Sequence, residues 1–557
     1  MDDITLKSLL EKDTIFPENT LITKENLAII DTCLLAAPII SEECFGVYKK
    51  FADMKQNAPE GMKNELFKVI RNYQKEKLQN KEYYDALLLN RFLIVKSKLE
   101  AQSYYDIAEI LLNIQNRDLS LEFLNYYRET ETNLPLKIIT TANFYNFQLK
   151  DYKSAIKYYE QYLNIEESKP VIFTTLGNLY KKAYQDDSLK EQIYYYEKGY
   201  QLKPNDRLIL HSLAFNYEKL GNRQKADKYY KELLENNPTD IDYYNYGGFL
   251  ISCGDLYNGH KYLTHRFLIN DINLQYPKGL DKNKKWDFKT DISDKILLVH
   301  YEQGFGDSIM YCRFLPGLKK LCRKVIFVVQ DGLYDLIKNS KKIAGGIEIL
   351  PEDTNIANIE YDYNIALIDV PFAVKISAEK LPYPKGYLDV SEQKVKNYTK
   401  QFIKNSNCLK VGIAYHGNKT SNYNGRDIDF SKFSKLLELK NIDFYSFNME
   451  DENDNRIVNL GKTFENFTDT ACALKNMDIV ISTDNVILNL AGALGVKTIG
   501  LFNKYPNFRW YKLTGDNTGY YDTVKPLQAE QNDRWMPVIS EVMNILKQQS
   551  DKKVKIF

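Results

Sequence analysis

The spacing of hydrophobic residues divides the chain into two parts that predict different folds. Up to about residue 270, apolar residues recur at helical spacing, as in SLAFNYEKLGNRQKADKYYKELLENNPTD. From about residue 290, short β-branched runs alternate with helical stretches, which is typical of parallel sheets with crossover helices. The expected strands are KILLVHY (295–301), KVIFVV (324–329), YNIALI (363–368), LKVGIAYHG (409–417), IDFYSFNM (442–449), DIVIST (478–483) and VKTIGLF (496–502).

In the helical part, prolines recur at a nearly constant interval. The intervals are 35, 34 and 34 residues, between Pro135, Pro170, Pro204 and Pro238. A 34-residue period is the length of a tetratricopeptide repeat (TPR), a unit of two antiparallel helices. Because proline cannot continue a helix, we expect Pro238 to end its unit. The pattern predicts a TPR-like solenoid over 135–270 and a helical region with degenerate repeats over 1–134, including one at 103–130.

The residue types within one unit fit this interpretation. Leu213, Tyr217 and Leu220 share one side of the expected first helix. Gly221 tolerates the left-handed conformation that ends a helix, and the small Ala226 lets the second helix approach the first. The tyrosine-rich stripes are interpreted as solenoid core and groove lining rather than as a cofactor site. A concave solenoid face binds an extended peptide or protein, or serves as an oligomerisation surface.

The expected strands form two groups, which predict two Rossmann-like domains. We place the first domain at 290–385 and the second at 386–550, with the proline-containing segment 371–408 as the connector. Ligands of open α/β sheets bind at the carboxyl ends of the strands. The functional residues are therefore expected in the loops that follow the strands.

Charge and composition exclude several classes of function. Lys and Arg total 75 against 74 for Asp and Glu, so the net charge is +1, which disfavours nucleic acid as a partner. The start, MDDITLKSLLEK, lacks the basic and apolar regions of a signal peptide, and no apolar run is long enough to span a bilayer. The seven cysteines form no CxxC pair. We therefore expect a cytoplasmic protein without disulfides or zinc.

The first candidate loop is YEQGFGDS (301–308), which follows the strand at 295–301. Gly304 and Gly306 allow the backbone to turn tightly and approach a ligand. With Gln303 they form the expected cleft loop. Asp307 then stands at the start of a helix. As a functional residue it would be a general base, and as a structural residue it would be an N-cap.

The second candidate loop is HGNKTSNYNGRD (416–427). Its cations, Lys419 and Arg426, suit a diphosphate or a nucleotide, although a solvated surface loop is the alternative for Lys419. Asp427 and Asp429 resemble a DxD metal site, but Asp429 precedes a helical pattern, so capping explains it better. No metal ion is expected.

The third candidate loop is STDNVILNLAGALG (482–495). Thr483, Asp484 and Asn485 lie at a strand-to-helix turn, where free backbone N–H groups are expected to face outward and bind phosphate. Asn489 lies about one turn inside the helix. The following AGAL segment is explained by close packing of the helix on the sheet.

These loops resemble a known family. HYEQGFGDSIMYCRFLPGL (300–318), HGN…RD (416–427), STDNVILNLAGALGVKTIGLF (482–502) and NFRWY (507–511) resemble bacterial TPR glycosyltransferases. The catalytic half is similar to the ADP-heptose:lipopolysaccharide heptosyltransferase family. The layout is similar to that of protein O-GlcNAc transferases and flagellin glycosyltransferases.

The resemblance implies a GT-B enzyme, with two Rossmann-like domains facing a cleft, that is metal-independent and inverting and uses a nucleotide-sugar as substrate without a further cofactor. It implies that Asp307 is the acceptor-side base and that Arg426 and the 482–490 turn hold the donor. The sequence departs from the family pattern at two places. Asn489 stands where a histidine is usual, and Asp484 is followed by Asn485 rather than by a small residue. Asparagine can donate a hydrogen bond to a phosphate but cannot carry charge.

Three hypotheses follow. The first is a glycosyltransferase acting on a protein presented by the TPR groove. The second is the same chemistry on a lipid-linked or polysaccharide acceptor, with the solenoid as a docking or dimerisation surface. The third is a non-catalytic scaffold with a degenerate GT-B module, for which Asn489 is the best evidence.

Overall fold

The computed structural model describes residues 6–7, 10, 21–38, 40–52, 59–96, 99–166, 169–270, 272, 274–302, 304–417, 426–450, 452 and 454–554. Two predicted site residues, Gln303 and Lys419, lie outside the described residues. The chain folds as two units, Met1–Asn216 and Tyr217–Phe557. The boundary between them falls inside helix α12 (Arg207–Lys219).

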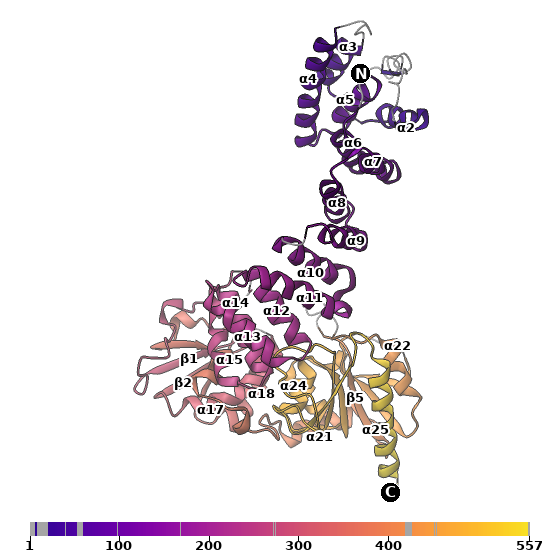
Figure 1. Ribbon diagram of the computed structural model, residues 1–557. Coiled ribbons are helices and arrows are strands. Elements are labelled where there is room, and N and C mark those ends of the chain that lie inside the picture. The colour runs from indigo at the N-terminus through magenta and orange to yellow at the C-terminus, as the bar shows by residue number, and fades with distance from the viewer. Residues whose placement is uncertain are drawn as a thin grey trace. The chain divides into compact units, whose positions relative to one another are not determined.

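The first unit is built of helix hairpins, as Figure 1 shows for each successive pair. Buried leucine, isoleucine and tyrosine side chains from facing helices form its cores. The helices before α12 are α2 (Lys24–Leu35), α3 (Glu42–Ala52), α4 (Glu60–Gln79), α5 (Tyr83–Lys96), α6 (Ala101–Asn113), α7 (Arg117–Thr130), α8 (Leu134–Asn143) with the π-helix η1 (Phe144–Gln148), α9 (Tyr152–Leu163), α10 (Pro170–Tyr184) and α11 (Leu189–Leu202).

Two turns within the hairpins share one backbone conformation. Gln115 and Lys150 adopt φ values of 65° and 52°, and each is followed by an N-cap residue of the next helix. The side chain of Asn116 accepts a hydrogen bond from the Leu119 N–H, and that of Asp151 accepts one from the Ser154 N–H. A left-handed residue ends one helix and the Asx cap starts the next, so the hairpin is specified locally.

The predicted repeats are present as helix pairs, with one correction of detail. Gly221 has a φ of 79° and ends the first helix of its pair, as expected. Leu220, however, lies beyond the end of α12 and is 46% exposed, so it is not part of the apolar side. Pro135 and Pro170 lie in the first turns of α8 and α10. A proline fits there because the first helical turn needs no N–H from it. Pro238 follows the end of α13 and ends its unit, as expected.

The second unit begins with the last repeats and continues into two parallel sheets. Its first helices are α13 (Arg223–Glu235), α14 (Asp240–Ser252) and α15 (Leu256–Leu263), followed by the 3-10 helix η3 (Thr264–Leu268). We call residues 240–268 the terminal helix pair. It packs directly on the first α/β domain, through ring contacts such as that between Tyr257 and Phe372.

The first sheet has the order β3-β2-β1-β4 and is parallel throughout. Its strands are β1 (Ile296–His300), β2 (Lys324–Val329), β3 (Glu348–Pro351) and β4 (Tyr363–Ala366). In the register, Val299 of β1 lies between Phe327 and Ile365. Its helices are α16 (Phe305–Tyr311), α17 (Leu315–Leu318), α18 (Asp331–Asn339), α19 (Lys341–Ala344) and α20 (Val370–Ala373), with η7 (Leu367–Asp369) before α20.

The second sheet has the order β10-β9-β8-β5-β6-β7 and is also parallel. Figure 1 shows its strands with the C-terminal helix beside them. The strands are β5 (Leu409–Ala414), β6 (Ile442–Ser446), β7 (Ile457–Asn459), β8 (Ile479–Thr483), β9 (Thr498–Phe502) and β10 (Val524–Gln528). The helices are α21 (Glu392–Phe402), α22 (Phe430–Phe433), α23 (Phe467–Lys475), α24 (Val486–Ala493) and α25 (Met536–Val554).

All seven predicted strands are present, and three further strands, β3, β7 and β10, were not predicted. The structure therefore has the expected fold class, a TPR-like all-α region followed by two parallel α/β domains. Among the described residues, every helix is too short or too polar to cross a lipid bilayer.

A buried ion cluster joins the terminal helix pair to the first sheet. The Arg266 guanidinium donates to both carboxylate oxygens of Glu302, over 2.9 and 2.6 Å, and to Asp369 over 2.5 Å. The three residues are at most 2% exposed. Glu302 follows β1 and Asp369 follows β4, so one guanidinium fixes the carboxyl ends of both strands.

This cluster predicts a large, position-specific loss of stability. Arg266→Ala leaves two buried carboxylates without their cation, and we expect it to lower the free energy of unfolding of the second unit by about 3–5 kcal/mol. The measurement is denaturant unfolding of the full chain, with hydrogen exchange of β1 to assign the transition.

Lys324→Ala is the matched control for Arg266→Ala. It breaks the half-exposed ion pair of Lys324 with Glu348 in the same sheet, and we expect a loss below about 1 kcal/mol. Equal losses from the two variants would contradict the role assigned to the buried cluster.

Candidate active site

The carboxyl ends of strands from both sheets face one cavity of about 990 Å³. From the first domain, Gly304–Asp307 follow β1. From the second, His416 and Gly417 follow β5, Phe447–Glu450 follow β6, and Asp484 and Asn485 follow β8. Asn507, Arg509 and Trp510 follow β9. Ligands of open parallel sheets bind at this edge, so the cavity is the candidate active site.

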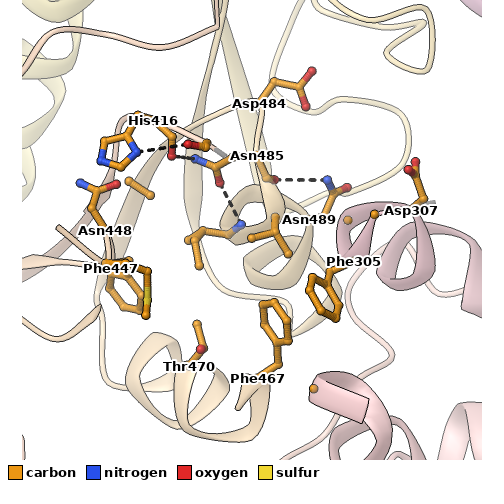
Figure 2. Close-up of a pocket in the computed structure, with 18 of the residues that line it drawn as sticks. Phe305, Asp307, His416, Phe447, Asn448, Phe467, Thr470, Asp484, Asn485 and Asn489 are labelled. Carbon is orange, nitrogen blue, oxygen red and sulfur yellow. Dashed lines mark hydrogen bonds between the residues drawn. The ribbon is translucent and has the colours of Figure 1, made fainter. Parts of the chain in front are cut away.

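An ion pair crosses the cavity. Nε of Arg509, from the second domain, lies 2.8 Å from Oδ1 of Asp307, from the first. Both side chains are about four-fifths buried, with 18% and 19% exposed. Asp307 is the third residue of α16, and Gly304 is the N-cap, so the interpretation of Asp307 as an N-cap is wrong. Its carboxylate instead faces the cavity beside Asn489, as Figure 2 shows.

Burial and charge act in opposite directions on Asp307. Burial raises the pKa of its carboxyl above the usual range, and the nearby Arg509 guanidinium lowers it. The pKa of Asp484 is raised by burial in the same way, against the effects of Trp510, Arg509 and Arg426. Arg509 thus lies among the cavity's acidic groups and opposes the rise in their pKa that burial causes.

The loop after β5 holds a second cation, Arg426, against the backbone. A Cβ atom at Gly417 would lie 2.8 Å from Nη2 of Arg426, so the guanidinium occupies the space that any side chain at 417 would take. The Gly417 N–H donates to Asp427 over 2.9 Å. Asp429 caps α22 by accepting from the Ser431 N–H, which confirms its predicted structural role.

The turn after β8 is organised by Asn485. Its Oδ1 accepts from the Ile487 N–H over 2.8 Å and from the Leu488 N–H over 3.4 Å, as N-cap of α24. Its Nδ2 donates to the carbonyl of His416, which ties the turn to the β5 loop (Figure 2). The expectation of free N–H groups is therefore wrong for Ile487 and Leu488, because the asparagine side chain already accepts from them.

Asn489 lies one turn into α24, between the two domains. Its Oδ1 accepts from the hydroxyl of Tyr521 over 3.1 Å, and its Nδ2 donates to the Asn485 carbonyl over 3.3 Å. A Cβ atom at Gly306 would lie 3.3 Å from the same Nδ2. The glycine thus permits the first domain to approach α24 where the side chain of Asn489 reaches the cavity.

The opposite end of the cavity is more apolar. The rings of Phe305 and Phe467 face each other with centroids 4.8 Å apart, one from each domain. Figure 2 shows this pair with Phe447 and Thr470 on the same side of the cavity. The cavity therefore has a charged end, with Asp307, Arg509 and Asp484, and an end lined largely by aromatic side chains.

The structure brings together most of the predicted site residues. Those that line the cavity are Gly304, Gly306, Asp307, Arg426, Asp484, Asn485 and Asn489. Thr483 is fully buried at the end of β8, where its hydroxyl accepts from Asn485 Nδ2 over 3.3 Å, and it is not part of the cavity wall. Within the described residues, no group of three or more His, Cys, Asp or Glu side chains is placed to hold a metal ion.

Sequence reasoning missed Arg509 as a site residue. It lies in NFRWY (507–511), a motif noted for the resemblance but not for its chemistry. The available signal was an arginine between aromatic residues in a loop that follows a predicted strand. The guanidinium carbon of Arg509 lies 5.3 Å from the ring centroid of Phe508.

The similarity of the chain to known proteins is distant. No protein-family model matches the chain. Protein FlbA of Caulobacter vibrioides is 21% identical over 475 residues, or 79% of this chain and 78% of FlbA. A glycosyl transferase family 9 structure from Veillonella parvula DSM 2008 aligns with 44% of this chain and 88% of its own, at 11% identity and a TM-score of 0.33. YrrB, a TPR protein with an unusual peptide-binding site, aligns with 31% of this chain and 87% of its own, at 19% identity and a TM-score of 0.26.

The ion pair across the cavity predicts a coupling between its partners. Arg509→Met leaves the partly buried Asp307 without its cation, and we expect a loss of about 1–2 kcal/mol in the free energy of unfolding. Adding Asp307→Asn should recover most of that loss, because the uncompensated charge is then gone. The measurement is a double-mutant cycle by denaturant unfolding at pH 7. Strictly additive losses would show that the two side chains do not interact in solution.

Proposed function

We propose that the chain is a glycosyltransferase that transfers a sugar from a nucleotide-activated donor to a protein acceptor presented by the TPR region. One observation carries the proposal. A carboxylate with a raised pKa, Asp307, projects from one α/β domain into a cavity whose other wall holds Arg426 and the start of α24. This is the pairing of a base and an anion site that group transfer from a sugar diphosphate requires.

In the proposed reaction, displacement at the anomeric carbon inverts its configuration. The acceptor hydroxyl oxygen forms a bond to the anomeric carbon while the bond from that carbon to the donor phosphate breaks. Asp307 takes the proton of the hydroxyl, and the leaving nucleotide keeps the bonding electron pair. Burial raises the pKa of Asp307 and so makes it a stronger base than an ordinary carboxylate, while the Arg509 charge opposes that rise. No metal ion is invoked, because the cations of the chain can neutralise the leaving group.

On the donor side, Arg426 is proposed to bind the diphosphate, and the dipole of α24 to add positive potential at its N-terminus. Since Asn485 accepts from the Ile487 and Leu488 N–H groups, the helix acts through its dipole rather than through those two groups. Thr483 acts indirectly, by holding Asn485. Asn489 donates from Nδ2 to a donor oxygen, which needs no charged side chain at that position.

For the acceptor, the protein substrate is favoured because one chain joins a repeat region to the cavity. A lipid-linked or polysaccharide acceptor is the second candidate, and substitutions in the repeat groove would leave transfer to it unchanged. A non-catalytic scaffold is the third. The position of the Asp307 carboxylate, in the same cavity as Arg426 and the start of α24, favours catalysis over a scaffold.

Asp307→Asn is the direct test of the base. Removing the proton acceptor should lower kcat by about 100- to 10,000-fold while nucleotide affinity stays within a few fold. Asp335→Asn, an exposed carboxylate on α18 of the same domain, is the control and should leave kcat unchanged. The measurement is transfer kinetics with the donor identified by binding. Full activity in Asp307→Asn would remove the assignment of the base.

The pH profile tests the role of Arg509. The base works only when deprotonated, so the rate falls as pH drops below the pKa of Asp307. Since the Arg509 charge lowers that pKa, Arg509→Met should move the acid limb of kcat upward by about 1–3 pH units, and Arg509→Lys by less. An acid limb that stays in place in Arg509→Met would show that Asp307 does not set it.

A further inference from the structure

The terminal helix pair, residues 240–268, contacts both sides of the ion pair in the cavity. One contact reaches the loop that leads into α16, the helix that carries Asp307, and another reaches the segment that carries Arg509. A third reaches Tyr311, the last residue of α16. These contacts lie outside the cavity wall, and no step of the proposed reaction uses them.

The first contact is made by Arg266. It binds Glu302 through two hydrogen bonds of 2.9 and 2.6 Å. Glu302 is five residues before Asp307 and two before Gly304, the N-cap of α16. Burial raises the pKa of Glu302, and the charges of Asp369 and Asp307 raise it further, against Arg266, so Glu302 lies within electrostatic reach of Asp307. Arg266 therefore fixes the start of the loop from which the base projects.

The second contact is made by α14. A Cβ atom at Gly248 would lie 3.3 Å from two ring atoms of Phe508, so the ring rests on the helix backbone. The ring of Tyr244, one turn earlier, meets Phe508 edge-on with centroids 6.4 Å apart. Phe508 is the chain neighbour of Arg509. A helix of the repeat region therefore sets the position of the segment that carries the cavity's cation.

The third contact is made by His260 of α15. Its Nδ1 lies 2.9 Å from the carbonyl oxygen of Ile368, and its ring meets Tyr311 edge-on at 5.3 Å. Tyr311 is fully buried at the end of α16, and the charge of Arg509 lowers its pKa against the effect of burial. His260 thus supports the side chain that lies beside the Arg509 guanidinium.

We infer that the terminal helix pair positions the Asp307–Arg509 ion pair, with Arg266 and Gly248 as its positioning residues. The expected effect on catalysis rests on the proposed function. The placement of the two segments that carry Asp307 and Arg509 does not depend on it. The last repeat is then both the end of the acceptor-binding solenoid and part of the support of the reacting groups. An acceptor held by that repeat is held at a fixed place relative to the base.

The size of the effect follows from the geometry of transfer. Reacting groups must be held to within a fraction of an ångström, and a displacement of about 1 Å can cost on the order of 100-fold in rate. Gly248→Ala must move Phe508 by a few tenths of an ångström. We therefore expect kcat to fall by about 10-fold, with KM for the donor unchanged, because no donor-binding residue moves. Alanine also favours a helix more than glycine does, so unfolding does not explain the loss.

The test is a double-mutant cycle in the full chain with Gly248→Ala and Arg509→Met, read by kcat and by the acid limb of its pH profile. If Gly248 acts through Arg509, Gly248→Ala should shift the acid limb and lower kcat in the wild-type background, and should do neither in the Arg509→Met background. Lys261→Ala, an exposed position on α15, is the control and should change neither quantity. Additive losses without a shift of the acid limb would overturn the inference.

Arg266 tests the other side of the pair. Arg266→Lys keeps the charge but loses the two-pronged contact with Glu302, and it should recover part of the kcat that Arg266→Met loses. If Arg266→Met does not fold, the comparison of Arg266→Lys with wild type takes its place. An unchanged kcat in Arg266→Lys would overturn the role of Arg266.

Hydrogen exchange separates this inference from the proposed function. Gly248→Ala should speed exchange in 505–512 and Arg266→Lys in 301–311, each by several fold, while Lys261→Ala changes neither. This measurement needs no substrate. A wild-type chain that transferred no sugar would contradict the proposed function, and unchanged exchange in both segments would overturn the inference by itself.

Discussion

The pairing of Arg266 with Glu302 and Asp369 is the constraint on which the α/β half depends. Charges this deeply buried are tolerated only when geometry and hydrogen bonding are complete, because each ion has lost its water. The cluster accordingly fixes three pieces of chain at once: the end of the repeats, the end of β1 and the end of β4. Glu302 is the second residue after β1, so in our proposal a residue of the last repeat sets the position of Asp307. The terminal helix pair and the cavity thus belong to the same unit of the chain.

Contacts of Arg313 and Tyr387 hold the second domain against the first. Arg313 of the first domain donates to the Tyr520 carbonyl over 2.6 Å and lies over the ring of Tyr387. The Tyr387 hydroxyl in turn donates to the Ile309 carbonyl of α16. The Asp307–Arg509 ion pair is a further contact between the two domains. The proposed chemistry is therefore divided between domains, with the base on one and the anion site on the other, and their separation is set by packing.

Much of this could be predicted from the sequence, and the rest could not for identifiable reasons. The proline period and the strands with strong apolar runs are local signals, and both predicted real elements. The three missed strands, β3, β7 and β10, are all edge strands. Edge strands are short and carry polar residues or proline, so their sequence pattern resembles that of a loop. Here Pro351 lies in β3 and Pro526 in β10. Arg509 was missed because its role depends on its ion pair with Asp307. Asp307 is distant in sequence, so only the fold shows that the two residues meet. Asn485 was assigned to a ligand because the sequence cannot show that its side chain already caps α24.

The central claim is that the cavity between the two sheets binds a nucleotide-sugar. A thermal-shift screen of the full chain against ADP, UDP, GDP, CMP and their sugar conjugates tests it most directly, with Arg426→Met as the matched variant. The account predicts that one nucleotide series stabilises the wild-type chain, by about 2.7 kcal/mol at 100 times its dissociation constant. It also predicts that Arg426→Met weakens that stabilisation. No shift with any nucleotide or nucleotide-sugar in the wild-type chain, with the unfolding of the second unit resolved, would contradict it.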